Sequence, residues 1–297
     1  MTTNILSKGD LFDAKLKTEI FNKVKGHSTL ARLSGQEPIP FNGSKEFIFS
    51  MDKEIDIVAE NGAKSHGGVT LAPVVMVPIK VEYGARVSDE FMYASEEEAI
   101  DIMKSWTDGF AMKMAKGFDL MGIHGVNPRT GEAAQLIGTN SFDTNEDVNV
   151  IEYDADDLEG NLDDAAAAID EFDVTGWGFS KEFASALSKL KVNGVPQYPE
   201  FRFGANPGAF SGTNCDVNST IGYGDEDMAI TGDFANCFKW GIAKEFNLEV
   251  IEYGNPDNSD DGDLKGHNQV YLRSEAFIGW GILVPEAFSV VKVVDEP

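Results

Sequence analysis

The segment from Phe47 to Gly125 constrains the fold of this chain most, because it predicts a long β-hairpin followed directly by a very long helix. A two-stranded hairpin on its own is at best marginally stable in water. The expected helix is far longer than the average of about three turns in globular proteins. We therefore expect a subunit that shares its surfaces with neighbouring copies.

The hairpin is predicted from two extended runs, Phe47–Val58 and Val69–Val81, which are separated by a polar turn around Asn61-Gly62. Proline cannot donate to a sheet ladder, so Pro73 and Pro78 belong on an edge or outside a sheet. A hairpin with so little to pack on needs support from elsewhere. A neighbouring subunit is the expected source.

The long helix is predicted to begin at Ser95, which forms a capping box with Glu98. Its length would be about 39 Å. Apolar residues recur along it at three- and four-residue steps, and they are Ala99, Ile102, Met103, Trp106, Phe110, Met114, Phe118 and Met121. Gly122 and Gly125 are expected to end the helix.

The N-terminal residues predict an amphipathic helix between Asp10 and Lys25. Its apolar residues recur every fourth position, at Phe12, Leu16, Ile20 and Val24. Lysines concentrate here in a chain that is otherwise acidic. Two interpretations stay open: a basic arm that docks on another copy, or an ordinary first helix that packs on its own domain.

A second region begins near Ala134. We predict helices over 163–169 and 180–190, a loop over the Gly-, Asn- and Ser-rich residues 204–224, and strands over 248–253, 270–272 and 288–293. Strands on both sides of a helix-containing middle indicate an α+β chain in which a second domain is inserted into the first.

Composition excludes several classes of partner. The 297 residues have room for about two domains, and 24 Lys and Arg against 50 Asp and Glu give a net charge of −26. Such a charge repels phosphate backbones and anionic lipid, so nucleic acid and membranes are poor direct partners. We see neither a signal peptide nor a membrane-length apolar run, and expect synthesis and retention in a cytoplasm. Cys215 and Cys237 are expected to be buried free thiols.

The motifs that usually carry chemistry are missing from the sequence. The histidines, at positions 27, 66, 124 and 267, lack the paired spacing of zinc hydrolases, so each is expected to be a surface or capping residue. No phosphate-binding glycine loop, dinucleotide fingerprint or nucleophile elbow occurs. We predict no catalytic, cofactor-binding or metal site and no cofactor. An acidic enzyme acting through carboxylates of residues 154–164 is kept as an alternative from another class.

Residues 257–263 are similar to the start of a calcium-binding loop, with oxygen-bearing side chains at alternate places and glycine sixth. The twelfth position is Asn268, where the motif needs a bidentate glutamate. We therefore expect a solvated acidic turn.

Four short motifs carry a family likeness. They are Val58-Ala59-Glu60-Asn61-Gly62-Ala63-Lys64, Val69-Thr70-Leu71-Ala72-Pro73, Val87-Ser88-Asp89-Glu90-Phe91-Met92 and Gly117-Phe118-Asp119-Leu120-Met121-Gly122. With the order of the parts, they resemble the major capsid proteins of tailed bacteriophages, which share the Hong Kong 97 capsid fold. The likeness covers most of the chain and is sharpest over residues 46–131.

The resemblance implies an α+β fold of the Hong Kong 97 type with four parts. They are an N-terminal arm (1–45), an extended hairpin loop (46–81), a peripheral domain with a long spine helix (82–133 and 246–281) and an inserted axial domain (134–245 and 282–297). It implies a structural protein, not an enzyme, that self-assembles through hexamers and pentamers into the icosahedral shell of a tailed phage or prophage.

The resemblance also implies partners and a location. A separate scaffolding protein, a portal and maturation factors are expected, with packaged DNA enclosed without sequence-specific binding and no membrane. Assembly would take place in the cytoplasm of a bacterial host, and the final location would be the virion capsid. An encapsulin-like bacterial compartment shell is the alternative with the same fold.

Lys64 invites one further comparison, because one relative locks its shell with Lys-to-Asn isopeptide bonds. We match neither the acceptor asparagine nor the assisting glutamate of that bond to a residue of this sequence. Lys64 is therefore expected to be a solvated lysine of the extended loop.

Overall fold

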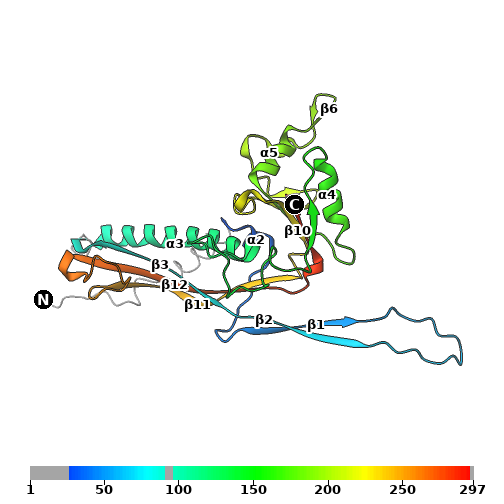
Figure 1. The fold of residues 1–297 in the computed structure, drawn as a ribbon, viewed down its shortest axis with the longest axis horizontal. Helices are drawn as coiled ribbons and strands as arrows, with labels where there is room; N and C mark the ends of the chain where they lie inside the picture. The colour runs from blue at the N-terminus through cyan, green and yellow to red at the C-terminus, as the bar shows by residue number, and fades with distance from the viewer. Residues whose placement is uncertain (1–26, 91–95, 295–297) are drawn as a thin grey trace.

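A computed structural model describes residues 27–90 and 96–294. The expected helix between Asp10 and Lys25 and the cap at Ser95 lie outside these residues. Figure 1 shows three parts: a long platform of helix and strands, a lobe above one end of it, and a hairpin that projects from the opposite side. A short helix, α2 (Thr29–Leu33), lies where the platform meets the lobe.

The platform consists of a three-stranded antiparallel sheet in the order β11-β12-β3, with helix α3 along it. Its elements are β3 (Ile79–Ser88), α3 (Glu96–His124), β11 (Phe238–Ile251) and β12 (Gln269–Ile282). Phe118 of α3 packs against Trp240 and Trp280 of the sheet, and all three are almost fully buried. The predicted helix is confirmed: it has 29 residues and ends before Gly125, whose φ of +67° suits glycine.

The hairpin consists of β1 (Ser44–Met51) and β2 (Val69–Met76), joined by a long tip over residues 52–68. The predicted first strand reaches too far, because β1 ends before Val58. The predicted second strand is in fact two, because β2 ends at Met76 and β3 begins after Pro78, which has no N–H to donate to a ladder. Pro73 lies in a two-stranded sheet, where every strand is an edge.

The lobe consists of a six-stranded mixed sheet in the order β4-β13-β10-β5-β9-β8 with two helices packed on it. Its strands are β4 (Asn149–Glu152), β5 (Gly176–Phe179), β8 (Ala209–Phe210), β9 (Thr213–Val217), β10 (Asp227–Gly232) and β13 (Phe288–Lys292). The helices are α4 (Leu158–Ala167) and α5 (Lys181–Lys189). Phe179 and Phe183 stand at the centre of its core and are fully buried.

Smaller elements complete the lobe and the connections. They are the hairpin of β6 (Lys191–Val192) and β7 (Val195–Pro196) and the 3-10 turns η2 (Pro199–Gly204), η3 (Tyr223–Asp225), η4 (Lys265–His267) and η5 (Pro285–Ala287). The described helices and largely antiparallel strands make the chain α+β, as predicted. None of the described helices has the length and apolar character that a membrane crossing requires.

Several predicted bounds within the lobe are corrected. The predicted loop over 204–224 contains β9, which pairs parallel with β5 and buries Cys215, so tertiary pairing overrides the loop composition. Helix α4 begins at Leu158, capped by Asp157, instead of at Asp163. Helix α5, capped by Ser180, is confirmed, and so are Cys215 and Cys237 as buried free thiols.

Candidate functional site

The hairpin exposes one continuous apolar face. Antiparallel pairing runs from Ser44 opposite Met76 to Met51 opposite Val69, and directly paired side chains share a face. The face therefore combines alternate residues of both strands, and its large apolar members are Phe47, Phe49, Met51, Val69, Leu71 and Val75. Each of them is between 49% and 71% exposed. Apolar side chains gathered in this way mark a surface that binds another molecule.

The tip of the hairpin extends this exposure. Ile55 and Ile57 are each 96% exposed. The Gly68 N–H donates to the Asp52 carboxylate and closes the base of the tip. Lys64 is exposed near the far end, and its expected role as a solvated lysine stays a prediction.

The base of the hairpin, in contrast, is fixed to the platform. Met76 is buried and packs on Gly281 of β12, where a Cβ would lie 2.6 Å from the Met76 Cγ. In the turn before β1, Phe41 makes an edge contact with Phe277 at 4.9 Å between ring centroids. These contacts fix the direction in which the exposed apolar face leaves the body.

A buried carboxylate in α3 holds the start of α2. Asp119 accepts hydrogen bonds from the Ser28 hydroxyl at 2.5 Å, the Thr29 N–H at 2.9 Å, the Leu30 N–H at 3.2 Å and the Thr220 hydroxyl at 2.7 Å. Burial raises the pKa of Asp119 to about 6, although these hydrogen bonds act to lower it. The start of α2 is therefore fixed against α3 by hydrogen bonds.

A second carboxylate, Asp216 of β9, ties α2 to the lobe. It accepts from the Thr29 hydroxyl at 2.6 Å, Arg32 Nη1 at 2.7 Å and Asn206 Nδ2 at 2.8 Å. Because Asp119 belongs to the platform and Asp216 to the lobe, α2 links the two parts.

Four ionisable side chains meet where α3 ends under the lobe, and we call them the junction cluster: His124, Asp143, Asp227 and Lys292. His124 Nδ1 lies 2.7 Å from Asp143 Oδ2 and 3.4 Å from Asp227 Oδ2, and its Nε2 lies 2.8 Å from the Thr220 carbonyl oxygen. Lys292 Nζ lies 3.4 Å from Asp143 Oδ1 and 3.7 Å from Asp227 Oδ1. Neither carboxylate oxygen of Asp227 has a hydrogen-bond partner within the described residues.

The surroundings of the junction cluster shift its protonation equilibria. Burial by itself lowers the pKa of His124, but the hydrogen bond with Asp143 and the two carboxylates raise it above its ordinary value. Burial raises the pKa of Asp227 to about 7, and the charge of Asp143 adds to the effect. Since His124 Nε2 faces a carbonyl, which only accepts, and Nδ1 faces a carboxylate, both nitrogens carry protons when Asp143 is ionised.

The junction cluster also includes the side chains closest to a metal-binding arrangement in the described part of the chain. The ligand atoms of His124, Asp143 and Asp227 lie within 4.8 Å of one another. A cation there would have to displace the Lys292 ammonium, and the 2.7 Å contact of His124 is a hydrogen-bond distance. The arrangement is that of an ion network joining helix, loop and sheet.

The structure corrects one expectation about the histidines. His124 was expected to be a surface or capping residue, but it is 8% exposed. His27, His66 and His267 are exposed, as expected. The only local signal for His124 is its place at the C-terminal end of a helix, where a cation is favoured. Its partners are distant in sequence, so no spacing motif links them.

The calcium-like segment is held by a cation of its own chain. Arg86 Nη2 lies 2.7 Å from Asp257 Oδ1, and Arg86 Nε lies 2.9 Å from Asp257 Oδ2. Arg86 also donates to Asn255 Oδ1 and to the Gly262 carbonyl. The hydrogen bonds from Arg86 lower the pKa of Asp257 to about 2. Asp257, the first ligand that a calcium ion would need, is thus already engaged.

Comparison with known proteins yields consistent matches. The sequence pattern of the phage capsid family matches residues 8–293. A solved structure from Mycobacterium phage Ogopogo is 30% identical, with a TM-score of 0.74, and the match covers 90% of this chain and 92% of that one. No sequence among curated proteins matches the chain.

Two further solved structures are similar. A chain from Gordonia phage Cozz has 24% identity and a TM-score of 0.72, with 91% of this chain and 87% of that one covered. A chain from the capsid of an empty GTA particle has 14% identity and a TM-score of 0.63, with 91% and 90% covered. At these identities the likeness shows the fold.

Proposed function

The chain belongs to the phage capsid family and is a major capsid protein of a tailed phage, and from this premise we propose that its copies join through the hairpin into the hexamers and pentamers of an icosahedral shell. The observation that carries the proposal is the exposed apolar face of β1 and β2. Covering such a face with a neighbouring subunit gains about 25 cal/mol per Å² of apolar surface.

Charge opposes assembly and apolar burial favours it. Each subunit carries a net charge of −26, so copies repel one another. At 0.1 M ionic strength the Debye length is about 10 Å, so salt largely screens the repulsion between charges that lie farther apart than this. Salt does not weaken the gain from burying the apolar face of the hairpin. Shell formation is therefore favoured by raised ionic strength.

The four-part division is carried over as part of the proposal. Residues 1–45 form the arm and 46–81 the extended loop. Residues 82–133 and 246–281 form the peripheral domain, and 134–245 and 282–297 form the axial domain. Helix α3 and strand β12 on one side, and the six-stranded sheet on the other, support two separate domains. The bounds at 81 and 245 nevertheless fall inside β3 and β11, which both belong to the platform sheet.

The proposed partners follow the same reasoning. A separate scaffolding protein, a portal and maturation factors act on the subunit in the cytoplasm of a bacterial host. The shell encloses DNA without sequence-specific contacts, which the net charge of −26 supports. The role is structural, without catalysis or a cofactor. Lys64 stays unlinked, so assembled particles should give only monomer in denaturing electrophoresis.

Sedimentation and negative-stain microscopy of the full chain test the proposal. At raised ionic strength we expect rings, tubes or shells. A variant in which residues 46–74, which carry the exposed apolar face and the tip, are replaced by a two-residue turn should stay unassembled while keeping its fold by circular dichroism. Assembly of that variant to the same extent as the unaltered chain would remove the role given to the hairpin.

A further inference from the structure

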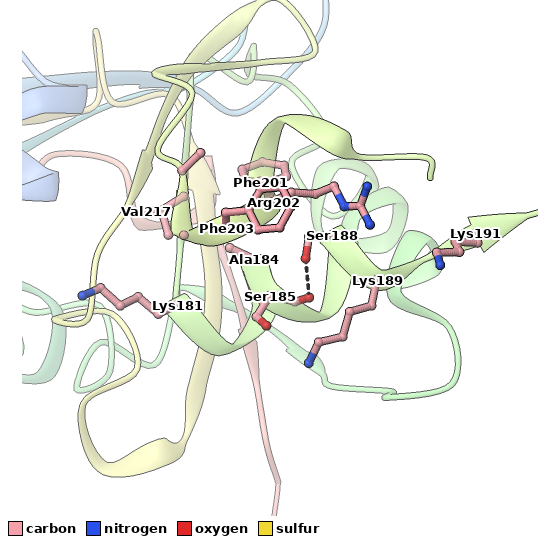
Figure 2. Close-up of a pocket in the computed structure, with 12 residues that line it drawn as sticks. Lys181, Ala184, Ser185, Ser188, Lys189, Lys191, Phe201, Arg202, Phe203 and Val217 are labelled. Carbon is pink, nitrogen blue, oxygen red and sulfur yellow. Dashed lines mark hydrogen bonds between the residues drawn. The ribbon is translucent and has the colours of Figure 1, made fainter. Parts of the chain in front are cut away.

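A basic groove lies on the lobe of this acidic chain. It runs between α5 and η2 and encloses about 520 Å³. Figure 2 shows Lys181, Lys189, Lys191 and Arg202 among its lining residues. Positive charge gathered in a protein of net charge −26 indicates a surface for an anionic partner.

The cations of the groove lack anionic partners within the described residues. Lys181, Lys189 and Lys191 are exposed and, like Arg202, form no ion pair there. The Arg202 guanidinium lies over the ring of Phe203, at 5.6 Å from the centroid. Lys181 also stands in the first turn of α5, where a positive charge opposes the helix dipole. These charges therefore do little for the fold of their own subunit.

An exposed aromatic side chain lies at the same groove. Phe203 is fully exposed and has a φ of +60°, a conformation that is uncommon for a residue with a side chain. Such local strain concentrates at functional sites. An aromatic ring next to an arginine is also the kind of pair that anchors protein interfaces. Figure 2 shows Phe203 close to Arg202 and Val217.

The complementary charge lies on α4 and the turn before it. Asp156, Asp163 and Asp164 are exposed, and within the described chain they form no ion pair; we call them the acidic ridge. Asp164 belongs to the last turn of α4, which contains no basic residue. A carboxylate there opposes the helix dipole, as Lys181 does in α5 with the opposite sign.

The groove and the acidic ridge lie on different sides of the lobe. In Figure 1, α5 lies on the left side of the lobe and α4 on its right side. A contact between the α4 side of one copy and the α5 side of the next is a head-to-tail contact, and repeated contacts of this kind form a ring when the rotation between copies closes. The two surfaces are thus arranged for a ring of identical lobes.

We propose that the basic groove binds the acidic ridge of a neighbouring copy within one ring of subunits. The inference rests on the proposed function and adds to it the two surfaces that meet. Double-stranded DNA is the disfavoured occupant, because the net charge of the subunit repels phosphates.

A charge-swap experiment in the full chain tests the proposal. Lys181→Glu with Lys189→Glu, or Asp163→Lys with Asp164→Lys, should each raise the protein concentration needed for assembly by about tenfold at low salt. The four changes together should restore assembly, because the signs again match. Lys113→Glu with Lys116→Glu changes the charge equally on exposed positions of α3 and is the matched control, which should assemble better than the groove variant.

Each outcome decides the question. Restored assembly in the fourfold variant, with an effect that shrinks at high salt, supports the groove-to-ridge contact. Normal assembly of the groove variant, or failure of the fourfold variant when circular dichroism shows that it is folded, overturns the contact but leaves shell formation by the unaltered chain intact. Normal assembly of the groove variant with lost binding to a double-stranded DNA oligonucleotide would assign the groove to DNA.

Discussion

The hairpin exposes aromatic side chains of the kind that the lobe buries. Phe47 and Phe49 of the hairpin are 60% and 58% exposed, whereas Phe179 and Phe183 of the lobe are fully buried. Both parts are built on strands, but the lobe lays α4 and α5 over its sheet, and no second layer covers the hairpin within residues 27–90 and 96–294. A stable sheet needs such a layer. The core of the lobe is thus formed within the subunit, whereas we propose that the hairpin is covered only on assembly.

The largest expected effect comes from changing the exposed apolar face of the hairpin. Phe47→Asp with Phe49→Asp places two charges on the face that a neighbour covers, and burial of an unpaired charge is very costly. We expect loss of assembly in sedimentation, with an unchanged melting temperature of the free subunit. Lys45→Asp, on the same face but already polar, should assemble far better. Loss of folding in the double variant would mean that the hairpin packs on its own subunit.

The claim that the lobe has its own core is tested by removing a buried aromatic side chain. Phe179→Ala should lower the free energy of unfolding by about 3–5 kcal/mol, because it leaves a cavity in a packed core. Phe49→Ala in the free subunit should change it by only about 0.5 kcal/mol. Urea unfolding of both variants gives the two values. Similar losses in the two would remove the distinction between the parts.

The junction cluster predicts how the attachment of the lobe responds to pH. The pKa of Asp227 is raised from 3.8 to about 7, so the folded state holds this proton more tightly than the unfolded chain. Its contribution is therefore greatest at low pH and is lost as pH rises through 7. The raised pKa of His124 acts in the same direction at higher pH.

Asp227→Asn removes this titration. The decline in unfolding free energy between pH 4 and pH 7 should shrink by on the order of 1–3 kcal/mol. Asp156→Asn, which alters an exposed carboxylate, should leave the decline as it is. Equal pH profiles for Asp227→Asn and the unaltered chain would contradict the assignment.

The smallest expected effect concerns the loop of residues 257–263. Added calcium should leave the melting temperature unchanged, since Arg86 already engages Asp257 through two hydrogen bonds. Arg86→Gln frees the Asp257 carboxylate, so this variant tests calcium binding to the loop more sharply than the unaltered chain does. A calcium-dependent rise in the unaltered chain would show that the ion displaces Arg86.

Local signals in the sequence were sufficient for the long elements. The apolar spacing along α3 predicted a helix that the structure confirms at 29 residues. The predicted helix over 180–190 is confirmed as α5, which Ser180 caps, and the alternating residues near the C-terminus predicted β13. In these elements the preferred local conformation and the final packing agree.

The remainder depended on contacts distant in sequence. Strand β9 lies in a segment with loop composition and becomes a strand because it pairs with β5. The junction cluster joins His124 to Asp227 and Lys292, which no spacing in the sequence connects. The hairpin was predicted from two extended runs, but the second run divides at Pro78, because β3 pairs with β12 in the platform sheet and β2 pairs with β1.

The run of β2 into β3 has a mechanical consequence. Strand β3 pairs with β12 without a break, from Ser88 opposite Gln269 to Ile79 opposite Ile278. Ladder hydrogen bonds lie across the strands, so a pull along the hairpin loads them together in shear and does not peel them one by one. In an assembled shell under internal pressure, the pairing of β3 with β12 would therefore resist extension of every subunit.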